Sequence, residues 1–281
     1  GAAGFIGSSL AKKFIDQGHK VTTIDNLSTG YKSNIPKGVA FIEGDCSDNK
    51  IIASLPRETF DAILHIAGQS SGEISFDDPI YDIQTNTEST LLLLKFALQN
   101  GCKRFIYAGT MSVYGIQKNQ PVNEDQFCKP ESFYGVGKLA SEHYMRIFQQ
   151  YGIQSTSLRL FNVYGPGQNL KNLRQGMVSI FLAQMLNTKN IHVKGSSKRY
   201  RDFIHIDDVV EAFQRCLKYK GSMGERINIA TGIKTTVGEL INKLISSQDN
   251  EITVEYSGET AGDIDGIYAD ISKMESILNM K

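Results

Sequence analysis

The segments GAAGFIG at residues 1–7 and KVTTID at residues 20–25 decide the fold of this chain. The first places three glycines three residues apart, and residues 8–15 after it have the apolar spacing of a helix. A glycine turn at the start of a helix lets backbone N–H groups and the helix dipole meet a pyrophosphate. The second segment has the composition of a β-strand and ends on Asp25, an acid that can accept hydrogen bonds from adenosine ribose hydroxyls. Together the two segments predict a dinucleotide-binding site.

A glycine turn of this kind normally follows a buried strand in the middle of a parallel sheet. No residue precedes Gly1 in the sequence. We therefore expect the natural protein to have roughly 6 to 10 further apolar-rich residues before Gly1, the length of a typical central strand. We also expect the chain to fold less well without this first strand, because two long parallel edges are then left unpaired.

The composition excludes several classes of protein. The 281 residues suffice for one large domain or two modest ones, and 30 basic and 30 acidic side chains cancel, so no nucleic-acid partner is indicated. No apolar stretch approaches the length that spans a membrane. The four cysteines are scattered without a CxxC pair, which favours a reduced, cytoplasmic compartment. The five histidines form no cluster with the spacing of metal ligands, so we expect no metal.

Strand and helix patterns alternate through the first part of the chain. Strands are predicted at KVTTID, VAFIEG (39–44), AILHIA (62–67), RFIYAG (104–109) and TSLRLF (156–161). Two long helices are predicted at about residues 79–100 and 133–151. Short apolar strands that alternate with helices indicate an α/β protein with a Rossmann-type, doubly wound parallel sheet.

The pattern changes after the GPG turn at residues 165–167. Predicted helices at 177–187 and 237–246 are then separated by short strands that glycines interrupt. We therefore predict a dinucleotide-binding domain at residues 1–165 and a smaller C-terminal α/β substrate lobe at residues 166–281. The segment at about 202–218 is predicted to return to the first domain, as a strand and a helix that rejoin the main sheet.

The sequence YGVGK places Tyr134 and Lys138 four residues apart at the start of a predicted helix, so they share one helical face. A lysine ammonium there favours the phenolate and lowers the pKa of the tyrosine, and an oxidised nicotinamide acts in the same direction. Such a tyrosine can move the proton of a sugar hydroxyl while hydride passes to a cofactor. By itself the motif has many chance matches and more often marks a surface tyrosine beside a solvated lysine.

The sequence GTMSVYG at residues 109–115 follows the predicted strand RFIYAG, so its hydroxyls lie at the carboxyl end of a strand. Ligands of open parallel sheets bind at that edge. Thr110 and Ser112 can both donate a hydrogen bond to a substrate oxygen. The alternative, a hydroxyl that only caps a turn, is more plausible for Ser112 than for Thr110.

These motifs resemble the extended short-chain dehydrogenases/reductases, in particular the nucleotide-sugar epimerase and dehydratase group. The resemblance covers essentially the whole chain. It rests on ten motifs in the family's order: GAAGFIG, IDNLSTG, GDCSD, HIAGQSS, NTEST, GTMSVYG, YGVGK, RLFNVYGPGQN, YRDFIHIDD and NIATG. It implies NAD as the cofactor, a nucleotide-sugar substrate of the UDP-hexose type and a homodimer. An acid at position 25 with no arginine in IDNLSTG favours NAD over NADP.

The resemblance also implies the roles of individual residues. Thr110, Tyr134 and Lys138 correspond to the catalytic group. The implied cofactor-binding residues are Gly1, Gly4, Phe5, Ile6, Gly7, Asp25, Asn26, Asp45, Cys46, Ala67, Gly68, Asn86, Ala108, Tyr134 and Lys138. The expected substrate-binding residues are Ser112, Asn162 and Arg201. The last two are similar to positions that bind the diphosphate, and an ion pair with Asp202, Asp207 or Asp208 is the alternative for Arg201.

Departures from the family pattern decide the expected reaction. Dehydratases of the family carry an acid–base pair directly after the threonine, where this chain has Met111 and Ser112, and neither can move a proton from carbon. A 4-epimerase needs only the hydroxyl, the tyrosine and the lysine. We therefore expect a UDP-hexose 4-epimerase, which works by transient oxidation to a 4-keto-sugar and return of the hydride. The alternatives are a keto-sugar reductase or dehydratase and a non-catalytic NAD-binding sensor. Thr260 stands where the family often has a diphosphate-binding arginine.

The expected homodimer would form through the two long predicted helices. The helix at 79–100 carries LLLLKFAL, with apolar residues on more sides than one contact with the sheet can bury. The helix at 133–151 is expected to lie beside it on the same face of the sheet. The alternative is that the run LLLL at residues 91–94 belongs entirely to the core.

Overall fold

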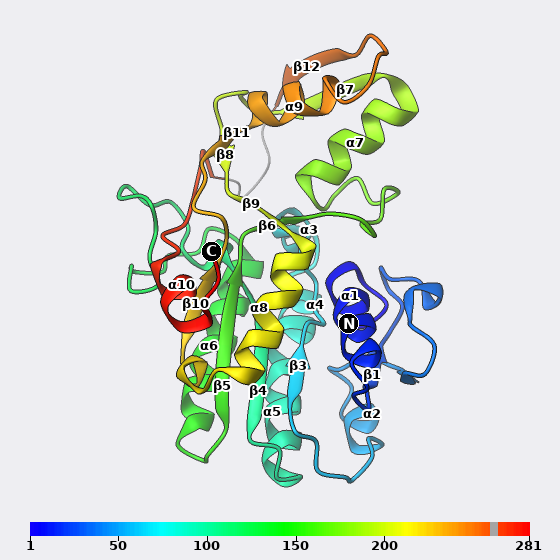
Figure 1. Ribbon diagram of the computed structural model, residues 1–281, viewed down its shortest axis with the longest axis vertical. Helices are drawn as coiled ribbons and strands as arrows, with labels where there is room; N and C mark the ends of the chain where they lie inside the picture. The colour runs from blue at the N-terminus through cyan, green and yellow to red at the C-terminus, as the bar shows by residue number, and fades with distance from the viewer. Residues whose placement is uncertain (259–263) are drawn as a thin grey trace.

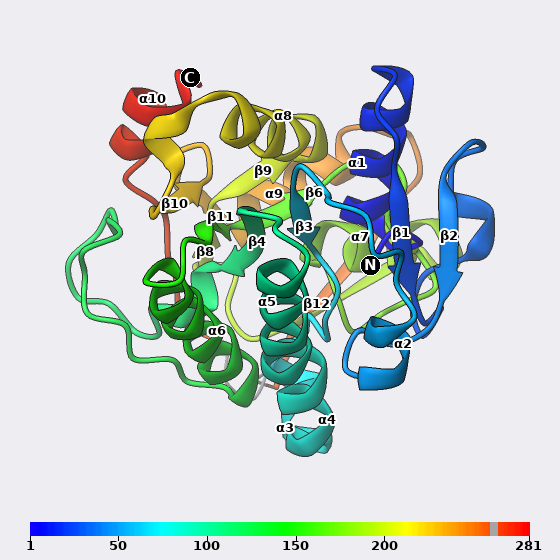
Figure 2. The same ribbon diagram turned by 90° about the horizontal axis from the view of Figure 1, so that it is seen from below.

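The computed structural model describes residues 1–258 and 264–281. It confirms the predicted α/β fold, with a parallel sheet covered by helices on both faces (Figures 1 and 2). The main sheet has four strands in the order β10-β5-β4-β3, all parallel. Their bounds are β3 (Ile63–His65), β4 (Arg104–Thr110), β5 (Gln154–Leu160) and β10 (Arg226–Ile229).

Helices cover both faces of this sheet (Figure 2). On one face lie α5 and α6, where Phe105 and Tyr107 of β4 pack against Leu94 and Met145. On the other face lie α1 and α8, where Ile106 of β4 packs with side chains of both helices. The helices of the first face are α2 (Asn49–Ala53), α3 (Gly72–Asp77), α4 (Pro79–Ile83), α5 (Ser89–Gln99) and α6 (Phe133–Gln149); those of the second are α1 (Phe5–Asp16), α8 (Ile206–Lys218) and α10 (Ser272–Leu278).

The strands β1 (Thr22–Asp25) and β2 (Ala40–Glu43) form a separate two-stranded parallel sheet. A cavity of about 670 Å³ lies between β1 and β3, with further walls from α1 and α5. Side-chain packing joins the two sheets, because Ile24 of β1 belongs to the same apolar cluster as Ile63 of β3 and Phe105 of β4.

The predicted helix at 79–100 is interrupted by a wide turn. A π-helical segment at Gln84–Glu88 separates α4 from α5, and it places Thr85 and Asn86 in the interior. Such π segments are frequent at functional sites, because they rotate side chains off the regular helical face. The run LLLL after it is mainly core, since Leu93 and Leu94 are buried and Leu91 and Leu92 are half-buried.

Part of the chain after residue 165 builds a smaller lobe above the sheet (Figure 1). Its core lies between α7, α9 and the parallel strands β7 and β12, and it contains Phe181, Val193 and Leu240. The bounds in this part are β6 (Asn162–Tyr164), α7 (Met177–Thr188), β7 (Asn190–Lys194), β8 (Tyr200–Arg201), β9 (Phe203–His205), β11 (Thr235–Thr236), α9 (Val237–Ile245) and β12 (Thr253–Ser257). Short 3-10 turns are η1 (Lys32–Asn34), η3 (Met111–Val113) and η4 (Lys220–Ser222).

The return of the chain to the main sheet differs in detail from the prediction for 202–218. Helix α8 does pack against β4 and β5, but β9 pairs with β6 and not with the main sheet, because both strands run through the junction of the lobes. The strand that joins the sheet is β10, beside β5, and α10 packs against it. Its Ile227 and Ile229 are fully buried in the core that α8 covers.

A buried ion pair fixes α6 to the sheet. The guanidinium of Arg159 on β5 is fully buried and donates to both carboxylate oxygens of Glu142 on α6, at 3.0 and 2.7 Å. The hydroxyl of Ser157 donates to the same carboxylate at 2.8 Å, and the ring of Tyr114 lies 4.8 Å from the guanidinium carbon. This bidentate geometry sets the position of α6 along the sheet.

We predict that Glu142→Gln lowers the free energy of unfolding by about 3–5 kcal/mol, because it leaves the guanidinium of Arg159 buried without its counter-charge. The control is Asp16→Asn, which breaks the exposed 2.9 Å pair with Lys12 and is expected to cost about 0.5 kcal/mol or less. Urea unfolding of both variants measures the difference. Equal losses for the two variants would contradict the assignment of this pair as the anchor of α6.

Candidate active site

A cavity of about 790 Å³ lies over the carboxyl ends of the parallel strands, where ligands of such sheets bind. The main sheet contributes the glycine turn, the strand tips and the start of α6, and the smaller lobe contributes residues 176–179 and Phe203. The predicted residues on its wall are Gly1, Gly4, Phe5, Ile6, Gly7, Asp25, Asn26, Asp45, Cys46, Ala67, Gly68, Ala108, Thr110, Ser112, Tyr134, Lys138 and Asn162. The fold thus brings most of the predicted site together in one cavity.

The glycine turn is closely packed beneath the first helix. A Cβ on Gly7 would overlap the carbonyl of Gly1, and a Cβ on Gly1 would lie 2.6 Å from the amide nitrogen of Ala67. Only glycine therefore allows the turn to approach α1 and the tip of β3 so closely. The result is a backbone cradle at the N-terminus of α1, which suits a pyrophosphate.

Asp25 at the tip of β1 is held in place by backbone amides. Its two carboxylate oxygens accept from the amides of Ala3, at 2.9 Å, and Leu27, at 2.8 Å. Lys32, the first cation after Asp25 along the chain, lies 3.2 Å from Glu43 and does not line the cavity. The carboxylate is therefore placed for ribose hydroxyls, and no basic side chain of the described residues stands beside it for a 2′-phosphate.

Asn26 and Asp45 form a second polar pair at this end of the cavity. Asn26 Nδ2 donates to Asp45 Oδ2 at 2.7 Å, and the Ser47 hydroxyl donates to Asp45 Oδ1 at 2.6 Å. Partial burial opposes ionisation, but the hydrogen bonds from Ser47 and Asn26 keep the pKa of Asp45 below its usual value. The neighbouring Cys46 is buried, and burial raises the pKa of its thiol, so it is a neutral wall residue.

Tyr134 and Lys138 lie on the cavity face of α6, whose first turn the Ser132 hydroxyl caps by accepting from the amide of Gly135 at 3.1 Å. Lys138 is 3% exposed, and its Nζ donates to the carbonyl of Ala108 at 3.2 Å. Burial lowers the pKa of Lys138 to about 8, although the negative charges of Asp82 and Glu142 act in the opposite direction. The ammonium form therefore predominates at neutral pH.

Burial raises the pKa of Tyr134 to about 12, a hydrogen bond with Thr110 lowers it, and the charge of Asp82 raises it, so the lowered pKa expected from Lys138 is not found in the protein without ligands. The lysine ammonium lies 5.8 Å from the centre of the tyrosine ring. Thr110 ends β4, and its hydroxyl accepts from the amide of Ser112 at 3.1 Å. Thr110, Tyr134 and Lys138 thus form one group of hydroxyl, phenol and ammonium, which can hold and transfer the proton of a bound hydroxyl.

Two predicted residues do not line the cavity. Asn86 is fully buried under Gly68, where its Nδ2 donates to the carbonyl of Gln69 at 3.0 Å. Arg201 donates to the carbonyls of Tyr200, at 2.7 Å, and Ile264, at 2.8 Å, and so ties β8 to the segment after the undescribed residues. Thr260 lies outside the described residues. The direct roles of Asn86 and Arg201 stay predictions.

Asn162 lines the cavity at the start of β6, and its buried Oδ1 has no hydrogen-bond partner among the described residues. Several further wall residues were not predicted: Ser70, Tyr81, Thr85, Gln175, Met177, Ser179 and Phe203. Ser70 belongs to the motif HIAGQSS and could have been selected from it. The others are brought to the cavity by the π turn and by the smaller lobe, which no local pattern indicates.

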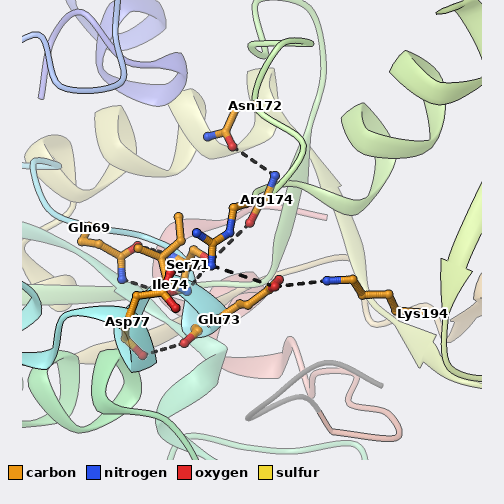
Figure 3. A network of polar contacts seen from close by, with 10 residues as sticks. Gln69, Ser71, Glu73, Ile74, Asp77, Asn172, Arg174 and Lys194 are labelled. Atoms are coloured by element: carbon orange, nitrogen blue, oxygen red, sulfur yellow. Dashed lines mark hydrogen bonds and ion pairs between the residues drawn. The ribbon is translucent and has the colours of Figure 1, made fainter. Parts of the chain in front are cut away.

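A polar network joins the two lobes at the mouth of this cavity (Figure 3). The guanidinium of Arg174 lies 2.7 Å from Asp77 on α3 and 4.0 Å from Glu73. Lys194 on β7 reaches Glu73 at 3.1 Å, and the Ser71 hydroxyl donates to the carbonyl of Arg174 at 3.2 Å. Helix α3 is therefore the point at which the smaller lobe is fastened to the dinucleotide half.

No helix in residues 1–258 or 264–281 is long and apolar enough to cross a membrane. Within the same residues, no group of three or more histidine, cysteine, aspartate or glutamate side chains could hold a metal ion.

A glycine cradle, a ribose-facing acid and a tyrosine–lysine pair over one parallel sheet define a dinucleotide-dependent enzyme of the short-chain dehydrogenase/reductase class. The chain belongs to the NAD dependent epimerase/dehydratase family, whose model matches residues 1–230. It is an enzyme of that family, and its cofactor is NAD.

Individual relatives extend over nearly the whole chain. The UDP-glucose 4-epimerase of Mycolicibacterium smegmatis is 30% identical over 285 residues, which cover 99% of this chain and 90% of that protein. The crystal structure of UDP-glucose 4-epimerase with UDP-glucose from Thermotoga maritima has a TM-score of 0.93 at 34% identity, and covers 100% of this chain and 91% of its own. The complex of the Thermus thermophilus UDP-glucose 4-epimerase with NAD has a TM-score of 0.90 at 29% identity, over 98% of this chain and 90% of its own.

We predict that the protein binds NAD more tightly than NADP, because Asp25 repels a 2′-phosphate. Asp25→Asn should weaken NAD binding about tenfold or more, through loss of a charge-assisted hydrogen bond, and reduce the discrimination. Calorimetric titration with both dinucleotides measures this. Asp48→Asn, at an exposed helix cap nearby, is the matched control and should change neither affinity. Equal affinities of the wild type for NAD and NADP would contradict the prediction.

Proposed function

We propose that this protein is a nucleotide-sugar 4-epimerase that acts on a UDP-hexose. The observation that carries the proposal is the joint position of Thr110, Tyr134 and Lys138 on the wall of the cavity that the glycine turn begins. The slots after Thr110 hold Met111 and Ser112, which offer no acid–base pair for dehydration. The relatives named UDP-glucose 4-epimerase, one of them solved with UDP-glucose, support the same substrate class.

The glycine turn would hold the pyrophosphate of NAD, Asp25 its adenosine ribose, and Tyr134 and Lys138 its nicotinamide ribose. NAD held there would supply a reversible acceptor for the hydride on C4 of the sugar. Thr110 would donate to the oxygen on C4 and hold it near Tyr134. Tyr134 would take the hydroxyl proton as a phenolate and give it back as a phenol. Lys138 would stabilise the phenolate through its positive charge.

The substrate would be bound by wall residues of the cavity that the cofactor does not cover. We propose that Asn162 donates from its side-chain NH₂ group to the substrate's diphosphate, and that Ser112 donates to the sugar. Arg201 would reach the diphosphate only after exchange of a carbonyl partner. The division into a dinucleotide domain, with residues 1–165, and a substrate lobe, with residues 166–281, is part of the same proposal, as is a cytoplasmic location.

Two alternatives use the same fold. A keto-sugar reductase consumes one reduced cofactor for each product, whereas an epimerase consumes none. A non-catalytic NAD-binding sensor needs no tyrosine–lysine pair, so the complete group argues against it. The test is incubation with UDP-glucose and, separately, UDP-N-acetylglucosamine, with products followed by proton NMR. We expect C4 epimers without net change in NADH absorbance. Absence of an epimer from both sugars would contradict the proposal.

We predict that Tyr134→Phe reduces turnover by about a hundredfold or more, because the ring stays in place and the proton carrier is lost. NAD affinity should remain largely intact. The control is Tyr144→Phe on the same helix, at a side chain that is 36% exposed. Steady-state kinetics and NAD titration of both variants decide the question, and retention of most activity in Tyr134→Phe would reassign the base.

We further propose that the protein is a homodimer through α4 and α6. The outer face of these helices carries neighbouring apolar side chains that are exposed. Among them, Phe76 of α3 stacks edge-to-face on Phe133 of α6, with 5.4 Å between ring centres. The exposed members of this face are Phe76, Ile80, Ile83, Leu98, Phe133, Val136, Tyr144 and Ile147. Contiguous exposed apolar surface of this kind is typical of an association site.

Light scattering should give twice the 31.1 kDa mass of one chain at micromolar concentration. Ile80→Glu combined with Val136→Glu should give the monomer, because it buries two charges in the interface. Leu186→Glu on α7, at a side chain 63% exposed like that of Ile80, is the matched control and should stay dimeric. A monomeric wild type would rule out this interface.

A further inference from the structure

A buried carboxylate lies beside the site without a role in the chemistry above. Asp82 on α4 is fully buried, and its Oδ1 accepts from Gln69 Nε2 at 2.8 Å and Asn86 Nδ2 at 3.1 Å. Its Oδ2 has no hydrogen-bond partner among the described residues. An unpartnered buried carboxylate oxygen is costly, so such a group persists where a positive charge compensates it.

The free oxygen of Asp82 faces the catalytic helix. A Cβ on Gly137 would lie 3.3 Å from Asp82 Oδ2, and Gly137 directly precedes Lys138. From the other side, Asn86 joins Asp82 to Gly68, and a Cβ on Gly68 would lie 3.5 Å from Lys138 Nζ. The carboxylate and the ammonium therefore flank the same few residues at the tip of β3.

The immediate contacts of Lys138 Nζ supply no negative charge. It donates to the carbonyl of Ala108 at 3.2 Å and lies 4.6 Å from the ring centre of Tyr107 on β4. Burial raises the pKa of the Tyr107 phenol, which stays neutral. On β3, burial holds the pKa of His65 well below its usual value, and the charge of Lys138 acts in the same direction, so this ring is neutral too.

Two acids, Asp82 and Glu142, act on Lys138 through their negative charge, and only Glu142 is also paired with another cation among the described residues. Glu142, one turn further along α6, forms the 2.7 Å pair with Arg159. Tyr134 on the same helix is protonated in the absence of ligands, because its pKa is about 12. Asp82 is thus the acid whose charge no cation in direct contact neutralises among the described residues. Burial raises the pKa of Asp82, while the hydrogen bond from Gln69, the charge of Lys138 and the hydrogen bond from Asn86 all favour its ionised form.

We propose that Asp82 is a positioning residue that serves as the counter-ion of Lys138, so that the ammonium keeps its proton and its place beside Tyr134. The inference rests on the proposed function, because Lys138 is assigned there as the residue that stabilises the phenolate. Without Asp82, Lys138 would lose its proton near neutral pH, and its charge would no longer act on Tyr134.

The test measures the titration of Lys138 directly in the full chain. Protein labelled with ¹³C at lysine Cε is titrated by NMR, and Lys138→Met identifies the signal by its loss. The wild-type signal should titrate near pH 8. In Asp82→Asn it should titrate about one pH unit lower or more, because an opposite charge has been removed. The asparagine oxygen can take the place of Oδ1, and its NH₂ group that of the unpartnered Oδ2.

Asp78→Asn is the matched control, since Asp78 is an exposed cap of the same helix that asparagine can replace. It should leave the Lys138 signal unchanged. An unchanged titration in Asp82→Asn would overturn the counter-ion role. A shifted titration in a protein that epimerises neither sugar would support the counter-ion role and refute the proposed function, so the two failures are distinguishable.

Kinetics and melting provide independent readouts. In Asp82→Asn the alkaline limb of the pH profile of kcat should move to lower pH, with KM for the sugar unchanged. An equal loss of kcat at every pH would indicate a merely structural role and overturn the proposal. Asp82→Asn should lower the melting temperature of the wild type but raise that of Lys138→Met, because the double variant buries neither charge. If it lowers both, the residue contributes packing alone and the proposal fails.

Discussion

A positive charge buried at the edge of the sheet is the constraint on which the rest of the site depends. The ammonium of Lys138 is placed there by α6, which the cap of Ser132 starts and the pair between Glu142 and Arg159 anchors to β5. Removing a charge from water is costly, and here the pKa of Lys138 falls only to about 8. The surrounding carbonyl, ring and carboxylates are therefore part of the site, although they touch no ligand.

The cavity that Lys138 lines has walls from both lobes of the molecule. Its dinucleotide half is built on close backbone packing at Gly1 and Gly7, where a Cβ would overlap neighbouring backbone atoms. Its outer half depends on the smaller lobe, fastened to α3 by the exposed ion pairs of Arg174 and Lys194 (Figure 3). Exposed pairs contribute little individually, so these ion pairs add little to the stability of the junction.

The sequence predicted the sheet, the glycine turn and the cavity residues at strand tips because each has a local pattern: alternation, spacing or a strand-end hydroxyl. It did not reveal the π turn that buries Asn86, since the pattern of residues 79–100 is that of a continuous helix. It also placed β9 in the main sheet, whereas the short strand β10 occupies that position. Arg201 lies against backbone carbonyls, and only tertiary structure decides which partner a buried guanidinium meets.

In the proposed reaction, Tyr134 moves only a hydroxyl proton, while the hydrogen on C4 leaves and returns inside the cavity. Epimerisation of UDP-glucose labelled with deuterium at C4, run in ordinary water and analysed by mass spectrometry and NMR, tests this most directly. We expect the product to keep its deuterium at C4. Loss of the label to water would contradict it, because the reaction would then proceed by removal of a proton from carbon.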